Sequence, residues 1–413
     1  MLRTRGSRSR RHGAGFFTTL VTNYSQGIAG SSDATPPTFE LPLRDLGSGQ
    51  VDLVPSLYGF GTVATFTRAT AAWTKLSSGL WASVASGVAR SCYLGATTLA
   101  DAYGGYFPEP AATQLVTPTA SIRDMTNAAW VKGATITVAK TGTGIDGVAN
   151  SCSRLTGGAV LATNTVFQTL TAAASSRTYS PWIRRVTGTG PIYITQDGGA
   201  TGDDVSSLIN STTFTRVSKT QSQLNASFGI LIEISLDQIE VDFNQFEAGA
   251  VATSPMDAAG AARNADLLTY PQAGNALNTV GSCYAELSVN WTGSTSANVI
   301  ALTDDVGRPL NASGPPTEIY TYDGTTIPGK TGLTSMATAV RKRASSWGGA
   351  GLSITGDGAT VATGAFDGTM GAGGGNISIG HDNSGNLSWN GTIRNVRIWT
   401  TQLSDGQLQA MTA

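Results

Sequence analysis

Apolar and polar residues alternate along the chain from residue 230 to residue 246. An alternation with period two is typical of a half-buried β-strand, because successive side chains point to opposite faces. The phase slips by one residue at Asp237-Gln238, which predicts a tight turn or a bulge. Each strand then has one apolar face that needs a second sheet, so the pattern predicts a β-sandwich. The apolar positions are Ile230, Ile232, Ile234 and Leu236 before the slip, and Ile239, Val241 and Phe243 after it.

Short apolar runs of the same kind fill residues 126–270. Clusters of Gly, Asp, Asn and Ser separate the runs, and such clusters are typical of turns. Many short strands with frequent turns predict a jelly-roll sandwich for this part of the chain. The expected strands are residues 134–139, 152–155, 166–170, 179–186, 192–195 and 214–218.

Residues 271–413 predict a second sandwich. The turn dipeptides Asp323-Gly324, Asp357-Gly358 and Asn390-Gly391 punctuate this part of the chain. Leu403–Leu408 follows the last run and predicts a closing helical turn. The expected strands are residues 282–289, 298–302, 318–322, 352–355, 377–380 and 389–399.

The first 125 residues predict an arm followed by a bridging β segment. In the arm, residues 1–50, no acidic residue precedes Asp33. The arm is either a disordered tail or a peg that docks on an acidic partner or a larger assembly. Contact with nucleic acid is the least favoured role, because no aromatic residue interleaves with the arginines. The bridge, residues 51–125, contains a Trp73–Trp81 hairpin pattern and a helical turn at residues 97–103. The arginines of the arm are Arg3, Arg5, Arg8, Arg10 and Arg11.

The composition agrees with an all-β protein and excludes some partners. Only 13% of the 413 residues are charged, and 51 are Gly, which suits turns and a neutral surface. The net charge of −1 gives no general attraction to nucleic acid. No apolar run approaches the roughly 20 residues of a membrane span. Threonines interrupt the apolar stretch near the N-terminus, so we expect no signal peptide.

The cysteines and histidines exclude several catalytic centres. Cys92, Cys152 and Cys283 are far apart and have no metal-binding spacing, so we expect three buried thiols. The only histidines are His12 and His381. This small number nearly excludes a Ser-His-Asp triad or a His-rich metal site. None of the glycine clusters lies between a predicted strand and a helix that follows it, so we expect no phosphate-binding loop. We therefore expect no metal and no cofactor.

Two tryptophans in glycine-rich surroundings are the candidates for a sugar-binding site. An exposed ring stacks on a sugar while polar neighbours fix the hydroxyls. Trp347 lies in a Ser-Ser-Trp-Gly-Gly segment, and Trp389 follows Asp382 and Asn383. Packing in the core, or contact between subunits, is the alternative for both rings.

Acidic residues provide two further alternatives. Asp203-Asp204 and Asp304-Asp305 carry the oxygen ligands that calcium prefers, but no spaced ligand set accompanies them. Glycoside hydrolysis needs two carboxylates across a cleft, and Glu286 with Glu318 is the least unfavourable pair. No spacing joins those two residues, so we expect a protein that is not an enzyme.

Several short motifs follow one another in order along the middle of the chain. They are Asn127-Ala-Ala-Trp130, Phe214-Thr-Arg-Val-Ser218, Gln245-Phe-Glu-Ala-Gly249 and Ala252-Thr-Ser-Pro255. In this order and spacing they resemble the carbohydrate-binding-module-like jelly roll of phage and prophage tail proteins. Residues 64–69 and 264–270 resemble the segments that precede and follow the jelly roll in those proteins, so the resemblance covers about residues 60–270.

The end of the chain resembles a second family. The run from Trp389 to Trp399, followed by the helical turn at residues 403–408, resembles the close of a concanavalin-A-like, laminin-G-like domain. This resemblance covers about residues 275–413.

Together the resemblances imply a bacteriophage virion protein on the particle surface, of the tail-fibre, tail-spike or head-fibre type. Its role would be structural attachment through the arm to other virion proteins, with receptor or host-glycan binding by the sandwiches. Fibres of this type are often homotrimers, so the resemblance also implies a homotrimer. The alternatives are a free, monomeric carbohydrate-binding protein and a polysaccharide depolymerase.

Overall fold

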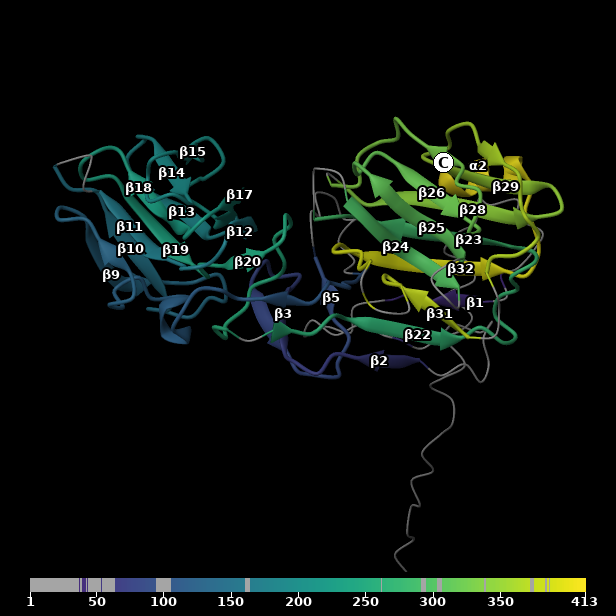
Figure 1. Cartoon of the computed structure of the whole chain (residues 1–413), viewed down its shortest axis with the longest axis horizontal. Coiled ribbons are helices and arrows are strands. Elements are labelled where there is room, and N and C mark those ends of the chain that lie inside the picture. The colour runs from purple at the N-terminus through teal and green to yellow at the C-terminus, as the bar shows by residue number, and fades with distance from the viewer. Residues whose placement is uncertain are drawn as a thin grey trace, which may run out of the picture. The chain divides into compact units, whose positions relative to one another are not determined.

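A computed structural model describes most of the chain after the arm. The described residues are 37, 39–41, 43, 53, 64–93, 105–159, 164–260, 262–290, 295–302, 307–337, 339–371, 375–382, 385 and 387–413. These residues form an all-β protein of antiparallel sheets with one α-helix and one short 3-10 helix, η1 (Thr119–Ser121). The predicted all-β sandwich architecture is confirmed (Figure 1).

Two five-stranded sheets and a three-stranded sheet form the first sandwich. Side chains from both five-stranded sheets share one buried cluster, which includes Leu155, Ile183, Val166 and Ile230, so the sheets face each other. The first sheet has the order β16 (Thr215–Arg216), β13 (Trp182–Thr187), β19 (Gln238–Asp242), β10 (Cys152–Thr156) and β9 (Thr137–Gly142). The second has the order β15 (Asp203–Asp204), β14 (Ile192–Thr195), β18 (Ser227–Ile232), β11 (Thr165–Thr169) and β8 (Val131–Lys132). The third has the order β17 (Lys219–Gln223), β12 (Ser175–Tyr179) and β20 (Phe246–Ala248).

The alternating stretch at residues 230–246 crosses between the two five-stranded sheets. β18 pairs with β11 and β14, whereas β19 pairs with β10 and β13. The predicted strand positions Ile234 and Leu236 were wrong, because both side chains lie in the connection and are 47% and 75% exposed. Leu236 has a φ of 68°, which ends the extended conformation there.

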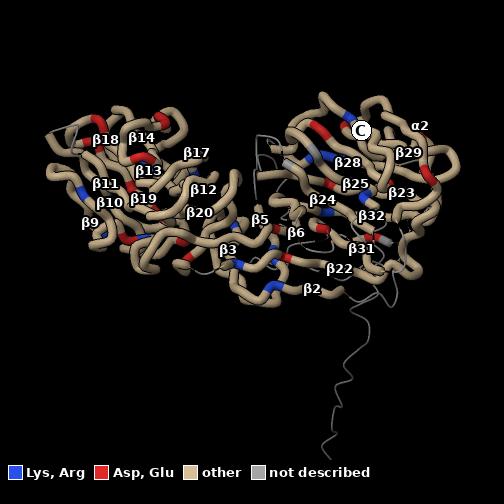
Figure 2. The backbone as a smooth tube through the Cα atoms, viewed as in Figure 1, with Lys and Arg blue, Asp and Glu red and all other residues tan. Residues whose placement is uncertain are grey.

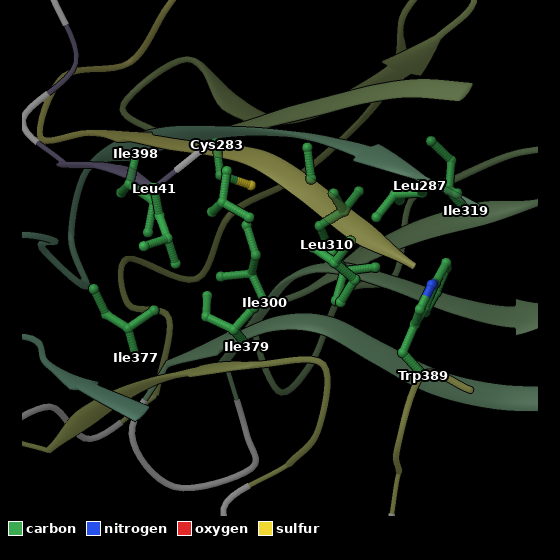
Figure 3. Close-up of a cluster of buried hydrophobic side chains, with 14 of the residues drawn as sticks. Leu41, Cys283, Leu287, Ile300, Leu310, Ile319, Ile377, Ile379, Trp389 and Ile398 are labelled. Carbon is green, nitrogen blue, oxygen red and sulfur yellow. The ribbon is translucent and has the colours of Figure 1, made fainter. Parts of the chain in front are cut away.

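An eight-stranded and a seven-stranded sheet form the second sandwich. Its core joins strands of both sheets, as Cys283 and Ile398 of one sheet with Ile300 and Ile379 of the other illustrate (Figure 3). The first sheet has the order β30 (Ala362–Gly364), β29 (Gly351–Gly356), β28 (Arg341–Gly348), β23 (Gly281–Leu287), β32 (Ile393–Trp399), β6 (Gly105–Tyr106) and β5 (Ser91–Cys92), with β1 (Phe39–Leu41) also on β32. The second has the order β2 (Thr65–Thr67), β22 (Leu267–Pro271), β31 (Asn376–Ile379), β24 (Thr295–Leu302), β25 (Gly307–Gly314), β26 (Ile319–Tyr322) and β27 (Gly329–Lys330).

The predicted closing helix is confirmed as α2 (Asp405–Thr412), which packs against β28 and β29 (Figure 1). Ser404 caps its first turn by accepting a hydrogen bond from the Gln407 N–H, and the Gln407 side chain accepts one from the Ser404 N–H. Leu408 seals the helix onto Tyr284 and Trp399 of the outer sheet face. None of the helices in the described ranges has the length and apolar character to cross a membrane.

Strands from the predicted arm and bridge join the sheets of the second sandwich. β1 and β6 pair with β32, and β2 pairs with β22. The predicted Trp73–Trp81 hairpin is confirmed as β3 (Ala72–Lys75) and β4 (Trp81–Val84). A further pair joins β7 (Ala112–Thr113) to β21 (Ala262–Arg263). Residues 37–413 form one compact unit. The predicted domain boundaries at 125/126 and 270/271 stay predictions.

Charged residues are sparse along both groups of strands, as Figure 2 shows. The three cysteines, Cys92, Cys152 and Cys283, are all buried free thiols, as predicted. The predicted helical turn at residues 97–103 lies outside the described residues.

Candidate functional site

The two tryptophans predicted to meet sugars are core residues. Trp347 and Trp389 are both 0% exposed and belong to the core of the second sandwich, where Figure 3 shows Trp389 among aliphatic side chains. Trp347 Nε1 donates a hydrogen bond to the Leu277 carbonyl at 3.0 Å, and Trp389 Nε1 donates one to the Ser288 carbonyl at 2.9 Å. The expectation of exposed rings was therefore wrong, because both indoles fill the space between the sheets and satisfy their N–H groups internally.

The polar neighbours of Trp389 do not supply an open site either. Asp382 is 5% exposed, and its carbonyl oxygen lies 2.5 Å from Nδ1 of His381. The Leu268 N–H donates to Nε2 of the same ring at 2.8 Å, so the histidine joins the segment after β31 to β22. Asn383 lies outside the described residues.

The carboxylates considered for hydrolysis lie in different sheets. Glu286 belongs to β23 and accepts hydrogen bonds from Arg394 Nε at 2.7 Å and from the Tyr284 hydroxyl at 3.2 Å. Glu318 precedes β26 and accepts a hydrogen bond from the Tyr320 hydroxyl at 2.7 Å. Neither residue lines either of the two cavities described below.

The acid pairs considered for calcium show no ligand cluster where they are described. Asp203 accepts a hydrogen bond from Lys219 Nζ at 2.6 Å, and Asp204 accepts one from the Ser206 N–H at 2.9 Å. Asp304-Asp305 lies outside the described residues. Within the described ranges, no group of three or more His, Cys, Asp and Glu side chains could hold a metal ion. The arm arginines, Arg3, Arg5, Arg8, Arg10 and Arg11, also lie outside the described part of the chain.

A cavity beside Trp73 combines an aromatic ring with open polar groups. It encloses about 240 Å³ and is lined by residues 70, 71 and 73, residues 255–258, and residues 262 and 263. The first segment precedes and opens β3, and the last belongs to β21. Pocket surveys place drug-sized ligands in cavities of roughly 300–1,000 Å³, so this cavity suits a smaller group such as one sugar ring.

Trp73 and Asp257 form the wall of this cavity. The indole is half-buried, and its Nε1 donates a hydrogen bond to Oδ2 of Asp257 at 3.2 Å. The ring packs edge-on against Phe243, with centroids 4.9 Å apart and an interplanar angle of 68°, and this contact fixes its orientation. Asp257 is itself exposed. This wall of the cavity therefore places an indole ring of fixed orientation beside a carboxylate that can accept hydrogen bonds from a ligand.

A hydroxyl group lies on the same wall. Thr70 accepts a hydrogen bond from the Asn264 N–H through its Oγ1 at 3.0 Å. Its hydroxyl proton can still be donated to a ligand. Met256 adds an apolar surface and is 6% exposed. The cavity thus combines the ring, acceptor and donor groups that orient a polyhydroxyl ligand.

A buried ion cluster supports the cavity from behind. Arg263, a lining residue, donates to Glu109 Oε2 at 2.6 Å and to Ser254 Oγ at 2.7 Å. Arg90 donates to the same Glu109 oxygen at 2.8 Å and also to Asp266. All these charged side chains are almost completely buried, so the cluster holds the segments around the cavity in a fixed geometry.

The pKa shifts in this cluster follow from its pairing. Burial by itself would raise the pKa of Glu109, but Arg263 and Arg90 hold that pKa below its usual value. Burial would likewise lower the pKa of Arg90, but Asp266 and Glu109 raise it above its usual value. The carboxylate and the guanidinium therefore both stay charged at neutral pH.

A larger cavity lies at the β28–β29 turn, but its lining has fewer polar side chains that could bind a ligand. It encloses about 540 Å³ and is lined by glycines and alanines together with Thr279 and Phe366. No charged side chain lines it. Because orientation of a ligand requires placed polar groups, the smaller cavity is the better candidate site.

The comparisons with known proteins give no family. No protein-family model matches the chain, and no curated protein matches it. One similar solved structure is the N-terminal CBM22-1-CBM22-2 tandem domain of Xyn10C from Paenibacillus barcinonensis, at 9% identity and a TM-score of 0.25. The match covers 71% of this chain and 99% of that chain. A TM-score this low does not by itself establish a shared fold.

The sequence indicated Trp73 only as a hairpin residue. Nothing in the local pattern separates an aromatic residue that lines a cavity from one that packs in a core. Asp257 lies 184 residues further along the chain, two residues after the end of the Ala252-Thr-Ser-Pro255 motif, so only the fold brings the two together. The one available signal was the position of Asp257 just beyond that motif.

Proposed function

We propose that this protein binds carbohydrate and carries out no chemistry of its own. The observation that supports the proposal is the cavity in which the Trp73 indole is held beside the exposed carboxylate of Asp257. A flat ring can stack on one face of a sugar, while Asp257 and Thr70 can exchange hydrogen bonds with its hydroxyls. The all-β architecture supplies the rigid sheets on which such a site is positioned.

Binding of the full-length chain to a panel of immobilised oligosaccharides tests the proposal. We expect Trp73→Ala to weaken binding to any recognised glycan by at least about tenfold, or about 1.4 kcal/mol. Trp182→Ala is the matched control, because Trp182 also packs partly buried against the core of the first sandwich but does not line the cavity. Equal loss in both variants, or no glycan binding by the parent chain, would contradict the proposal.

We further propose that the protein is a virion component of the fibre, spike or head-fibre type, anchored by its N-terminus on the phage particle surface. The resemblance of its motifs to phage tail proteins supports this role, and so does a low charge content that suits burial between subunits of a homotrimer. The proposed partners are other virion proteins and a host-surface glycan. A free carbohydrate-binding protein and a polysaccharide depolymerase are the alternatives.

Deletion of the arm tests the virion role. The deletion should end at Pro36, because Leu41 and Leu43 are both 0% exposed in the core of the second sandwich. We expect the shortened chain to fold and to bind glycan but not to enter particles. Continued incorporation would contradict anchoring by the arm. Release of new reducing ends from a bound polysaccharide would contradict the non-catalytic role.

A further inference from the structure

We propose that the Trp73 cavity selects uncharged saccharides over their carboxylate counterparts. This inference rests on the proposed carbohydrate-binding function and specifies the ligand class of the same site. It follows from the signs and positions of the charges around the cavity.

The exposed group of the cavity wall disfavours anionic sugars. Asp257 is the carboxylate on the lining, and its Oδ2 is held toward the ring by the Trp73 N–H at 3.2 Å. The other charged lining residue, Arg263, is 3% exposed. Its Nη1 is engaged by Glu109 and Ser254, and its Nη2 donates to the Pro110 carbonyl at 2.7 Å. Its Nε–H has no partner but is buried. A uronate would therefore meet the Asp257 carboxylate without an accessible guanidinium to bind it.

The charged groups of the buried cluster are covered by protein. Arg68, Arg90 and Arg263 pair with Glu109 and Asp266, and all five side chains are at most 3% exposed. Asp257, by contrast, is exposed on the lining. The charge that a bound sugar contacts at this wall is therefore the Asp257 carboxylate.

A neutral ring avoids this repulsion. Its hydroxyls can donate to Asp257, and the Thr70 hydroxyl can donate to a ring or hydroxyl oxygen. Its apolar face can lie on the indole of Trp73, and the cavity of about 240 Å³ limits the contact to roughly one residue of a longer chain. Selection would thus come from charge exclusion, with stacking and hydroxyl contacts supplying affinity.

Calorimetric titration of the full-length chain tests the inference. The probes are neutral oligosaccharides of the gluco, galacto and manno series, each with its C6-carboxylate counterpart. We expect the best neutral probe to bind at least about tenfold more tightly than its carboxylate form. In Asp257→Asn, whose side-chain oxygen can still accept from Trp73, the penalty for the carboxylate form should shrink severalfold.

The outcomes separate this inference from the proposed function. Equal or tighter binding of the carboxylate form, with Trp73→Ala still abolishing it, would overturn the charge selection and leave carbohydrate binding intact. An unchanged carboxylate penalty in Asp257→Asn would overturn the assigned role of Asp257. Failure of both classes to bind would overturn both proposals together. Thermal unfolding of Asp257→Asn at the parental temperature confirms that the variant is folded.

Discussion

Arg68 and Asp266 form a buried ion pair although they lie 198 residues apart in the chain. Nη1 of the arginine lies 2.6 Å from Oδ1 of the aspartate, and both side chains are 0% exposed. Asp266 also accepts a hydrogen bond from the Glu109 N–H at 3.2 Å and one from Arg90. This carboxylate therefore connects the segment before β3 to the segment before β22, next to the Trp73 cavity.

Removing Asp266 should strongly destabilise the fold. Asp266→Ala leaves the guanidiniums of Arg68 and Arg90 buried without this partner, and loss of one partner of a buried pair costs about 3–5 kcal/mol. We expect urea unfolding to show a loss of that size. If the variant does not accumulate, Asp266→Asn, which keeps the shape of the side chain, should show the same direction of change.

An exposed ion pair provides the control for this prediction. Asp203 pairs with Lys219 at 2.6 Å, but its side chain is 53% exposed. Asp203→Ala should therefore cost no more than about 1 kcal/mol. Similar costs for Asp203→Ala and Asp266→Ala would show that burial of the cluster does not control its energetics.

Trp389 and Trp73 should respond to truncation in opposite ways. Trp389→Ala removes a fully buried ring and should cost about 3–5 kcal/mol of unfolding free energy. Trp73 is only half-buried, so Trp73→Ala should cost less stability but remove glycan binding. Denaturant unfolding and glycan binding measured on both variants test the contrast. Glycan binding lost in a folded Trp389 variant would reverse our assignment of the two rings.

The three thiols should be inert in the native protein. Burial raises the pKa of Cys92 to about 11 and raises the pKa values of Cys152 and Cys283 to about 12 each. The reactive species is the thiolate, which is scarce well below the pKa. A thiol reagent at a pH of about 8 should label none of them before unfolding and all 3 afterwards. Rapid labelling of the native chain would contradict their burial.

His381 should make the fold sensitive to mild acid. Burial lowers the pKa of its imidazole below the ordinary value, and the neutral ring accepts the Leu268 N–H. The unfolded chain, with a histidine pKa of about 6.5, therefore binds more protons than the folded one as the pH falls. Stability should decrease below a pH of about 6.5, with a limiting slope of about 1.4 kcal/mol per pH unit.

The variant His381→Gln isolates this effect. Its unfolding free energy, measured by urea denaturation between about pH 7.5 and pH 5.5, should depend less on pH than that of the parent chain. An unchanged slope would assign the acid sensitivity to other groups.

The local pattern of the sequence was sufficient to predict many of the longer strands and the closing helix. The strands around Ile230, Val241 and Cys283 follow from apolar alternation, but the eight-residue strands β25 and β28 were not predicted. Alternation failed at Ile234 and Leu236, where the chain leaves one sheet for the other. The glycine-rich surroundings of Trp347 and Trp389 predicted exposure, but the facing sheets bury both rings.

The sequence by itself determined that this chain forms antiparallel sheets, because strand periodicity and turn residues act between near neighbours. Only the tertiary structure decided that β18 and β19 face each other across a core, and that Trp73 meets Asp257 in a cavity. Those contacts join residues far apart in the chain. They depend on which apolar faces cover each other and how the buried charges pair, and no local pattern encodes either choice.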